Sequence, residues 1–291
     1  MKGIILAGGK GTRLYPMTLQ VNKHLLPVYD KPMIYYPIST LMISGIKEIL
    51  IISTPESISQ FESLLGNGNQ IGCNIKYAVQ ENPTGIADAF IVGKNFIGKE
   101  SVALILGDNI FYGSGLGKIL RNNINNRGAT IFPIFVNDPS RFGVLEFNQD
   151  GKIISIEEKP KFPKSNFAIP GIYFYDNSVI KKSESLNFSE RGEKEITDLN
   201  KLFLNQGELN YSIFPRGITW LDTGTPESLS DSCDFVRIVE KTSNKKIACI
   251  EEVALRSNFI SIENFKNSIN NYNNSLYGDY LKKVLLEFEK N

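Results

Sequence analysis

The sequence predicts an α/β protein with a Rossmann-like, mixed but mainly parallel sheet flanked by helices. In the first half, short β-branched runs alternate with helical patterns, as in a parallel sheet with crossover helices. From Thr130 the strands follow one another closely, which indicates an antiparallel flap, and after Pro226 the pattern is helical. We therefore expect an α/β domain at 1–240, containing a flap subdomain at 130–225, and a C-terminal helical extension at 241–291.

The elements of the first half are bounded by glycines and polar turns. Strands are expected at Lys2–Ala7, Glu48–Ser53, Ile75–Val79 and Val102–Leu106, and helices at Ile34–Gly45, Ser57–Leu65 and Ile86–Asn95. Ligands of such a sheet bind beyond the carboxyl ends of its strands. Gly8, Gln80 and Asp108 all fall at such ends.

The second half is expected to begin with closely spaced strands. These lie at Thr130–Val136, Gly143–Phe147, Ile153–Glu158 and Phe167–Tyr175, with turns at Asp138-Pro139 and Asp150-Gly151. A helix at Ile196–Asn205 and strands at Leu209–Phe214 and Thr219–Asp222 complete this half. The segment Ser261–Asn274, rich in Asn and Ser, is expected to be a loop between the last helices.

Composition excludes several classes of protein. The 291-residue chain has a net charge of +1, which provides no long-range attraction to nucleic acid or to a membrane. Its apolar runs are far shorter than the ~20 residues of a membrane span. The three cysteines, Cys73, Cys233 and Cys249, are widely spaced and predict reduced thiols in a cytoplasmic protein. The single histidine, His24, excludes a histidine-based metal site.

A glycine-rich loop after the first strand is the strongest functional signal. Gly8-Gly9-Lys10-Gly11 ends a buried apolar run, and Thr12-Arg13 follows at once. Successive N–H groups in such a loop form a cradle for anions, and arginine adds a charged fork that suits phosphate oxygens. The pattern matches neither the dinucleotide-binding fingerprint nor the P-loop. A simple turn is the alternative interpretation, which the arginine disfavours.

Two aspartates follow predicted strands. Asp108 comes after Ala103-Leu104-Ile105-Leu106, and Asp222 comes after Trp220-Leu221. Two carboxylates near a phosphate cradle suit Mg²⁺, which takes one or two carboxylates plus substrate phosphates. The alternative is that each aspartate caps a turn or a helix.

Other candidates each have a structural alternative, which the sequence alone slightly favours for Glu157-Glu158-Lys159-Pro160. Glu157-Glu158-Lys159-Pro160 could bind sugar hydroxyls and a sugar phosphate, or could be a solvated strand end. The loop from Gln80 to Gly85 could read a base edge through an amide, or could be only a turn. Lys10, Lys23 and Lys31 stand between a role in a site and the surface.

Several longer motifs resemble those of the sugar-1-phosphate nucleotidylyltransferases, and in particular the thymidylyltransferases that act on glucose 1-phosphate. They are LAGGKGTRL, LLPVYDKPMIYYP, LGDNIFYG, GVLEF, EEKP with PKSNFA, GEKEITDLN and WLDTGT, and the resemblance extends from Lys2 to Leu281. It implies a Mg²⁺-dependent in-line transfer of dTMP from dTTP to glucose 1-phosphate. The products would be pyrophosphate and dTDP-glucose, a precursor of dTDP-rhamnose and cell-surface polysaccharide. It also implies a homotetramer and an extension at 241–291 that makes oligomer or regulatory contacts.

The resemblance also assigns roles to individual residues. Those expected to bind the nucleotide are Leu6, Gly8, Gly9, Gly11, Thr12, Arg13, Gln80, Gly85 and Asp108. Arg13, Lys23 and Asp108 would be catalytic, and Asp108 and Asp222 would hold Mg²⁺. The sugar phosphate would lie against Asn109, Gly143, Glu158, Lys159 and Ile169. A regulatory site would include Arg216, Glu252, Val253 and Arg256.

Four departures from the family pattern stand out. His24 replaces a common Gln, Phe142 replaces Tyr, and Ile169-Pro170 replaces Val-Thr. The loss of the tyrosine hydroxyl at Phe142 removes one hydrogen bond that a family member could make near the sugar. Ser114-Gly115-Leu116-Gly117 replaces a segment that usually contains His, so feedback control by dTDP-rhamnose is a hypothesis.

The implied reaction agrees with the residues. A phosphate monoester has a second pKa of about 6, so the nucleophile is ionised at pH 7 without a general base. The reaction instead requires cations near the α-phosphate, because the anionic sugar phosphate must approach the anionic triphosphate. The alternatives are a uridylyl, guanylyl or cytidylyl transferase, a noncatalytic nucleotide-sugar sensor, and a GT-A glycosyltransferase. The last would need an Asp-x-Asp motif, which Gly107-Asp108-Asn109-Ile110 lacks.

Overall fold

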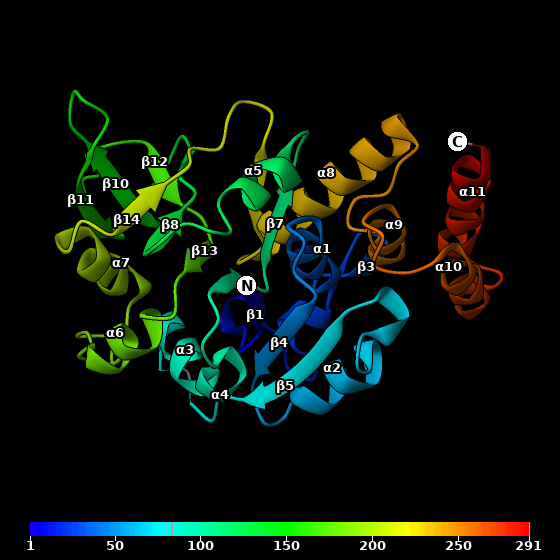
Figure 1. The fold of residues 1–291 in the computed structure, drawn as a ribbon, viewed down its shortest axis with the longest axis horizontal. Coiled ribbons are helices and arrows are strands. Elements are labelled where there is room, and N and C mark those ends of the chain that lie inside the picture. The colour runs from blue at the N-terminus through cyan, green and yellow to red at the C-terminus, as the bar shows by residue number, and fades with distance from the viewer. Residues whose placement is uncertain (83, 291) are drawn as a thin grey trace.

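The computed structural model describes residues 1–82 and 84–290, and a seven-stranded sheet forms its centre (Figure 1). The strands are β1 (Lys2–Leu6), β4 (Glu48–Ser53), β5 (Asn74–Val79), β6 (Val102–Leu106), β8 (Ala129–Ile131), β13 (Ile172–Tyr175) and β14 (Leu209–Tyr211). Their order is β14-β8-β13-β6-β1-β4-β5. Among these strands β13 alone runs against its neighbours. The predicted mainly parallel sheet is confirmed.

Helices cover both faces of this sheet, which explains its unbroken apolar strands. Ile4 and Ile5 are both fully buried, and they point to opposite faces because side chains alternate along a strand. The Ile5 face packs against α1 (Tyr35–Ile43), α2 (Ile58–Leu65) and α5 (Leu116–Asn122). The Ile4 face packs against α3 (Ala89–Val92), α4 (Lys94–Ile97), α6 (Val179–Ser185) and α7 (Ile196–Asn205). The expected helix Ile86–Asn95 is wrong in one respect, since Gly93 separates α3 from α4.

The strand order creates a crevice beside β1. The chain passes from β1 to β4 and β5 on one side, and then returns to place β6 on the other side of β1. Leu6 and Leu106 are register partners at the ends of β1 and β6. Because the loops after these strands leave toward opposite sides, a ligand site is expected between them.

The flap is a four-stranded antiparallel sheet with the order β11-β10-β12-β9. Its strands are β9 (Ile134–Phe135), β10 (Gly143–Phe147), β11 (Ile153–Glu158) and β12 (Phe167–Ile169). Two expected strands are wrong, because Thr130–Val136 and Phe167–Tyr175 each divide between the two sheets. The breaks fall at Pro133 and Pro170, which have no N–H to donate to a ladder. The strand expected at Leu209–Phe214 ends at Tyr211.

Two small strand pairs complete the sheets. β7 (Asn109–Tyr112) pairs antiparallel with β15 (Thr219–Asp222), and β2 (Pro27–Val28) pairs with β3 (Lys31–Pro32). The sequence pattern predicted β15 but not its partner β7. The unpredicted strand β7 helps to form the candidate site, because it begins directly after Asp108.

The C-terminal part is helical, as expected, and its last three helices lie at one end of the molecule (Figure 1). It contains α8 (Pro226–Ser243), α9 (Ile250–Arg256), α10 (Ile262–Ile269) and α11 (Leu276–Lys290). The expectation of a loop at Ser261–Asn274 is wrong, because α10 occupies much of it. Ser261 caps this helix by accepting from the Asn264 N–H, and Phe265 and Ile269 bury one face. The surrounding asparagines and serines hid that short apolar pattern.

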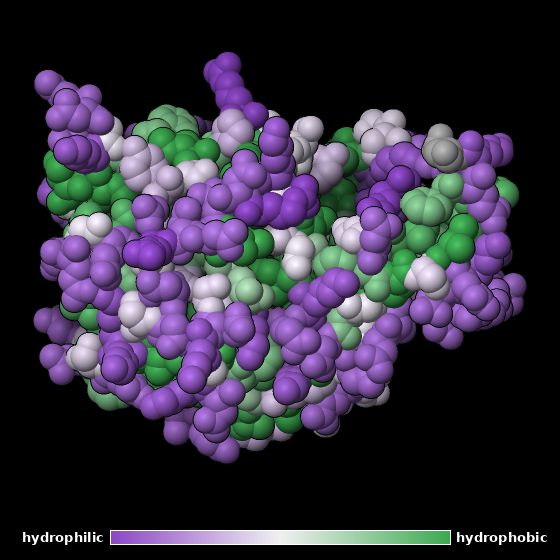
Figure 2. Space-filling model, viewed as in Figure 1, coloured by the Kyte–Doolittle hydropathy of each residue, from purple (hydrophilic) through white to green (hydrophobic). Residues whose placement is uncertain are grey.

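The extension shares its core with the α/β domain. Leu281 and Val284 of α11 belong to the same buried cluster as Ile5 and Ile51 of the sheet. In the described residues no helix is long and apolar enough to span a bilayer. On the face shown in Figure 2, hydrophobic residues form small groups among hydrophilic ones.

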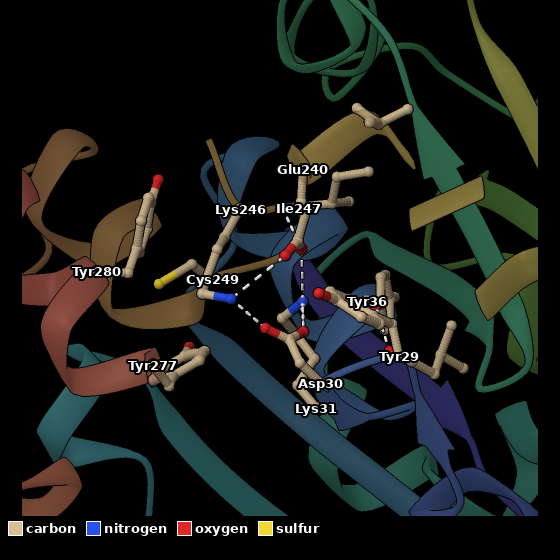
Figure 3. A network of polar contacts seen from close by, with 12 residues as sticks. Tyr29, Asp30, Lys31, Tyr36, Glu240, Lys246, Ile247, Cys249, Tyr277 and Tyr280 are labelled. Carbon is tan, nitrogen blue, oxygen red and sulfur yellow. Dashed lines mark hydrogen bonds and ion pairs between the residues drawn. The ribbon is translucent and has the colours of Figure 1, made fainter. Parts of the chain in front are cut away.

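A buried network of charges joins the β2–β3 hairpin to the C-terminal helices (Figure 3). The side chain of Lys31 is 1% exposed, and its Nζ lies 2.8 Å from Glu240 Oε1 and pairs with Asp30. Lys246 pairs with the same two carboxylates, and the N–H of Ile247 donates to Glu240 at 2.9 Å. Lys31 is therefore a buried structural lysine, and its network ties the hairpin to the end of α8.

Candidate active site at the ends of β1 and β6

The glycine-rich loop is anchored at both of its ends. The carbonyl of Ala7 accepts hydrogen bonds from Ser53 Oγ at 2.9 Å and from Asn22 Nδ2 at 3.2 Å. Gly11 has a φ of +60°, a conformation that favours glycine, and it starts the 3₁₀ turn Thr12–Leu14. Leu14 is fully buried, whereas Arg13 is exposed. The buried leucine thus fixes the turn that presents the arginine.

A cavity of about 270 Å³, here named the glycine-loop cavity, brings the predicted phosphate and metal residues together. It is lined by Gly8, Gly9, Gly11, Thr12, Arg13, Lys23, Asp108, Asp222 and Gly224. Residues far apart in the chain therefore meet where the strand order predicts a site.

The β7–β15 ribbon places the two aspartates next to each other. Asp222 is the register partner of Asn109, and Thr223 Oγ1 donates to the Asp108 carbonyl at 2.9 Å. Lys23 Nζ forms an ion pair with Asp108, and Asn109 Nδ2 donates to Asp108 Oδ1 at 2.9 Å. One lysine and one amide thus hold Asp108 in place.

The pKa values of the two aspartates move in opposite directions. Burial raises the pKa of Asp108, but the Lys23 cation and its hydrogen bond outweigh it and hold that pKa below its usual value. Burial, followed by the negative charge of Asp108, raises the pKa of Asp222. The two carboxylates are therefore close enough to repel each other across the glycine-loop cavity.

This pair fits a divalent cation. Within the described chain there is no group of three or more His, Cys, Asp or Glu residues arranged around a metal position. A site with two carboxylates, completed by substrate phosphates, is what Mg²⁺ commonly takes. A cation between Asp108 and Asp222 would also remove the repulsion that raises the pKa of Asp222.

A second cavity of about 210 Å³ lies between the flap and the main sheet, and we name it the flap cavity. Every residue expected to contact the sugar phosphate lines it: Asn109, Gly143, Glu158, Lys159 and Ile169. Glu158 accepts a hydrogen bond from Thr197 Oγ1 at 2.5 Å, whereas its neighbour Glu157 pairs with Lys164. This alternation is that of a strand with one face toward the cavity.

Asn109 has a supporting position in this cavity. Its side chain is 2% exposed, and its Oδ1 accepts from Trp220 Nε1 at 2.6 Å and from the Gly171 N–H at 3.0 Å. Its amide thus joins Asp108 to Trp220 and to the start of β13.

The flap cavity also contains residues that the sequence reasoning missed. Trp220, Thr197, Tyr173 and Arg141 line it. Arg141 Nη2 lies 3.2 Å from Asp222 Oδ2, and the Phe142 ring meets the Trp220 ring edge-on at 4.6 Å between centroids. Phe142 therefore fills its position by aromatic packing. The position of Arg141 in the sequence, directly before the turn at Phe142-Gly143, was the one signal that could have identified it.

A third cavity of about 490 Å³, the Gln80 cavity, lies on the other side of the glycine-rich loop. Gln80 and Gly9 line it together with Tyr15, Leu19 and Val21, three apolar side chains that are each at least 40% exposed. Gln80 itself is 8% exposed, at the end of β5.

Two of the expected nucleotide residues do not line these cavities. Leu6 lies at the end of β1, where its carbonyl accepts from the Gly107 N–H at 2.9 Å. Gly85 has a φ of +106°, and a Cβ there would lie 2.5 Å from the Lys194 carbonyl oxygen, so its glycine is a packing requirement. Pro83, in the loop between Gln80 and Gly85, lies outside the described residues.

The three cavities lie in a row. Gly9 lines both the Gln80 cavity and the glycine-loop cavity. Arg13 and Asp222 line both the glycine-loop cavity and the flap cavity. A molecule with three parts could therefore extend across all of them, with its central part against the glycines.

His24 is a structural residue beneath the site. It is 4% exposed, and its Nδ1 lies 2.8 Å from Asn22 Oδ1. Burial, aided by the Lys23 charge, lowers its pKa from 6.5 to about 4, so the ring is neutral at pH 7. A Cβ at Gly107 would lie 2.6 Å from this ring, which explains a glycine directly before Asp108.

The structure brings together part of the expected regulatory set. Glu252, Val253 and Arg256 lie on α9, where Arg256 Nε donates to Glu252 Oε1 at 2.7 Å. Tyr280 of α11 donates to the other oxygen of Glu252. Arg216 is exposed between β14 and β15 and, in the described residues, makes no hydrogen bond or ion pair with these three.

Comparison with known proteins gives consistent results. The family model for nucleotidyl transferases matches residues 2–237. A glucose-1-phosphate thymidylyltransferase of Mycolicibacterium smegmatis is 51% identical over 285 residues, which cover 98% of this chain and 99% of that protein. One from Neisseria meningitidis serogroup A is also 51% identical, over 286 residues that cover 98% of this chain and 99% of that protein.

Two solved structures have similar folds. One, described as a glucose-1-phosphate thymidylyltransferase of Bacillus anthracis with bound sucrose, has a TM-score of 0.75 and 43% identity and covers 81% of this chain and 95% of that one. The other, a UDP-glucose pyrophosphorylase with UDP-glucose, has a TM-score of 0.70, covers 81% of this chain and 98% of that one, and is 23% identical, so it shows the fold alone.

Proposed function

This chain belongs to the nucleotidyl transferase family, and from that premise we propose how its three cavities serve one reaction. The activity is that of a glucose-1-phosphate thymidylyltransferase, which forms dTDP-glucose and pyrophosphate from dTTP and glucose 1-phosphate. The observation that carries the proposal is that neighbouring cavities share lining residues. Gly9 joins the Gln80 cavity to the glycine-loop cavity, and Arg13 and Asp222 join the glycine-loop cavity to the flap cavity. The base would lie in the Gln80 cavity, the triphosphate in the glycine-loop cavity and the sugar in the flap cavity.

The chemical step is a displacement at the α-phosphorus of dTTP. A phosphate oxygen of glucose 1-phosphate forms the new P–O bond, while the bond from the α-phosphorus to the oxygen of the leaving pyrophosphate breaks. Arg13 lines both the triphosphate and the sugar side, so its guanidinium can stabilise charge on the α-phosphate as the two anions meet. Lys23 lines the glycine-loop cavity beside Asp108, and its cation would act together with Arg13.

Nucleotidyl transferases generally use a divalent metal, and we propose Mg²⁺ here, held by Asp108 and Asp222. When bound, it would neutralise charge on the triphosphate. The protein's own part is to keep both carboxylates ionised and close together. Lys23 pairs with Asp108 and Arg141 pairs with Asp222, and both cations favour the ionised form of Asp222.

The flap residues would orient the acceptor sugar. Glu158 is fixed by Thr197, so its carboxylate can accept hydrogen bonds from sugar hydroxyls. Lys159 Nζ lies 3.3 Å from Glu158 Oε1 and is 41% exposed, so it can reach the sugar phosphate. The base discrimination is expected to be partial for uracil, because a single methyl group is worth only ~1–3 kcal/mol in a pocket.

Pyrophosphate release tests the proposal. Purified protein with Mg²⁺ and glucose 1-phosphate is supplied with dTTP, UTP, CTP, GTP or ATP in parallel. We expect fast release with dTTP, slower release with UTP and none without the sugar phosphate. Tight binding of dTTP or dTDP-glucose without any release would favour a nucleotide-sugar sensor instead.

The assembly and its regulation are further parts of the proposal. We propose a homotetramer, in which exposed apolar side chains of the C-terminal helices, such as Leu276 and Ile238, would be covered. Sedimentation analysis tests it. Feedback by dTDP-rhamnose at Arg216 and the α9 residues would be excluded if a saturating concentration left the rate unchanged.

A further inference from the structure

The amide of Gln80 is held by two residues of the loop that follows it. Gln80 Nε2 lies 3.0 Å from Asp88 Oδ2 and 3.4 Å from Thr84 Oγ1. Thr84 Oγ1 in turn donates to the same Asp88 oxygen at 2.6 Å. Gln80 is 8% exposed, and within the described part of the chain Asp88 and Thr84 are the hydrogen-bond partners of its amide nitrogen.

The chemistry of a carboxylate fixes which way this amide points. Asp88, as a carboxylate, accepts hydrogen bonds only, so the NH₂ group of Gln80 must face it. The carbonyl oxygen must then face away from Asp88. It points toward the glycine-rich loop, because a Cβ at Gly8 would lie 3.6 Å from Gln80 Oε1.

The loop that carries Asp88 and Thr84 is tied to the segment before α7. The carbonyl of Thr84 accepts from the Lys194 N–H at 2.7 Å, and the Ala87 N–H donates to the Lys194 carbonyl at 3.2 Å. Gly85 packs against the same Lys194 backbone. Asp88 is therefore held by a rigid framework and can resist rotation of the Gln80 amide.

We propose that Asp88, assisted by Thr84, is a positioning residue that sets base specificity by presenting Gln80 Oε1 as a fixed acceptor. This rests on the proposed function, in which Gln80 faces the base. Thymine and uracil have an N–H donor at N3, whereas cytosine has a lone pair there. A fixed carbonyl oxygen accepts a hydrogen bond from N3 of thymine or uracil and repels the lone pair on N3 of cytosine. An amide that is free to rotate could present its NH₂ group instead, and would then tolerate cytosine as well.

The test compares kcat/KM for dTTP and dCTP, at saturating glucose 1-phosphate and Mg²⁺, in the wild type and in Asp88→Asn. The asparagine can present either a donor or an acceptor to Gln80, so the preference for dTTP over dCTP should fall by about tenfold or more. Thr84→Val should give a smaller decrease in the same direction. At saturating dTTP, kcat and the KM for glucose 1-phosphate should change by less than about threefold. Asp198→Asn, an exposed carboxylate on α7 that pairs with Lys201, is the control and should keep the wild-type preference.

Binding separates this proposal from the reaction itself. The affinities of dTDP and dCDP are measured by calorimetry for the same variants, without sugar phosphate. If Asp88→Asn keeps the wild-type ratios in both experiments, the inference is wrong while the transferase function stands. If the wild type releases no pyrophosphate with dTTP, the proposed function fails, and the dTDP to dCDP affinity ratio still decides the role of Asp88.

Discussion

Arg13 is the exposed cation at which the glycine-loop cavity and the flap cavity meet. Arg13→Ala should lower kcat by roughly 10²–10³, comparable to the loss of one preorganised donor to a transition state. The kcat of Arg13→Lys should lie between those of the wild type and Arg13→Ala, because lysine keeps the charge but loses the planar fork. Arg237→Ala, which removes an exposed arginine paired with Asp234 on α8, is the matched control for steady-state turnover. Turnover of Arg13→Ala within a few-fold of wild type would remove its proposed role.

Asp108 and Asp222 share one small cavity, and each should contribute to metal affinity. Either Asp108→Asn or Asp222→Asn should raise the Mg²⁺ concentration for half-maximal turnover by at least about tenfold, since even outer-shell partners of metals are worth that much. The measurement is a Mg²⁺ titration of pyrophosphate release at fixed substrates, with Asp198→Asn as control. An unchanged titration in both variants would mean that the metal is held elsewhere.

His24 gives the fold a pH dependence of known sign. Its native pKa of about 4 is below the ordinary 6.5, so between these values the unfolded chain binds a proton that the native protein excludes. The contribution of neutral His24 to the free energy of unfolding is therefore fully present well above pH 6.5, and it is lost as the pH decreases toward 4. The loss at pH 5 relative to pH 7 should be about 2 kcal/mol.

Urea unfolding at pH 7, 6 and 5 measures this contribution. His24→Gln has no group that titrates in this range, so the wild type minus variant difference isolates the histidine. Equal slopes for the two proteins between pH 7 and pH 5 would show that native His24 takes up its proton normally.

The individual site residues were predictable to different degrees. Arg13, Asp108 and the glycines were evident because they directly follow a strongly apolar strand. Arg141 and Asp88 were not, since each gains its importance from a partner that is remote in the chain or buried by the fold. Lys31 shows the same limit, because its burial depends on Glu240, more than two hundred residues away.

At the scale of elements, the network around Lys31 fastens the β2–β3 hairpin to α8. Glu240→Ala should destabilise the protein by about 3 kcal/mol, because it leaves a buried cation short of one partner. Asp234→Ala, an exposed aspartate on the same helix, should cost less than about 0.5 kcal/mol. Free energies of unfolding from urea titration make the comparison.

A double variant separates charge burial from packing in this network. Replacing Lys31 and Glu240 together by Met should recover much of the loss, since an apolar pair of similar volume avoids the unpaired charge. A loss below about 1 kcal/mol for Glu240→Ala alone would show that Asp30 suffices as the partner of Lys31.

The elements themselves were predicted best where one pattern ran without interruption. β1, β4, α1 and α2 agree with their predicted positions to within one or two residues. The errors concentrate where the chain leaves one sheet for another at Pro133 and Pro170, because residue spacing does not reveal a change of sheet. β7 was missed although Asp108 beside it was found, and the ribbon it forms with β15 is what brings Asp222 into the site.

At the scale of the whole molecule, the shared core predicts cooperative unfolding. Leu281 is fully buried in the cluster that also contains Ile5, so Leu281→Ala should cost about 2–5 kcal/mol for the entire protein. Trp220, the only tryptophan, lines the flap cavity and reports unfolding of that part of the α/β domain by fluorescence. Leu286→Ala, on the same helix but 57% exposed, is the control. If Trp220 unfolds at the same urea concentration in Leu281→Ala as in the wild type, residues 241–291 form an independent unit.

The distribution of the cavities along the chain has a consequence for diversification. Among the described residues, those that line the Gln80 cavity, and Asp88 behind it, come from the first 88 positions. Of the same described stretch, the flap cavity takes only Arg13 and Ile86, and its other lining residues begin at Leu106. A recombination joint within 89–101 would therefore exchange nucleoside preference and sugar preference as separate modules. Chimaeras of related genes joined there offer a direct route to enzymes that make new combinations of nucleotide and sugar.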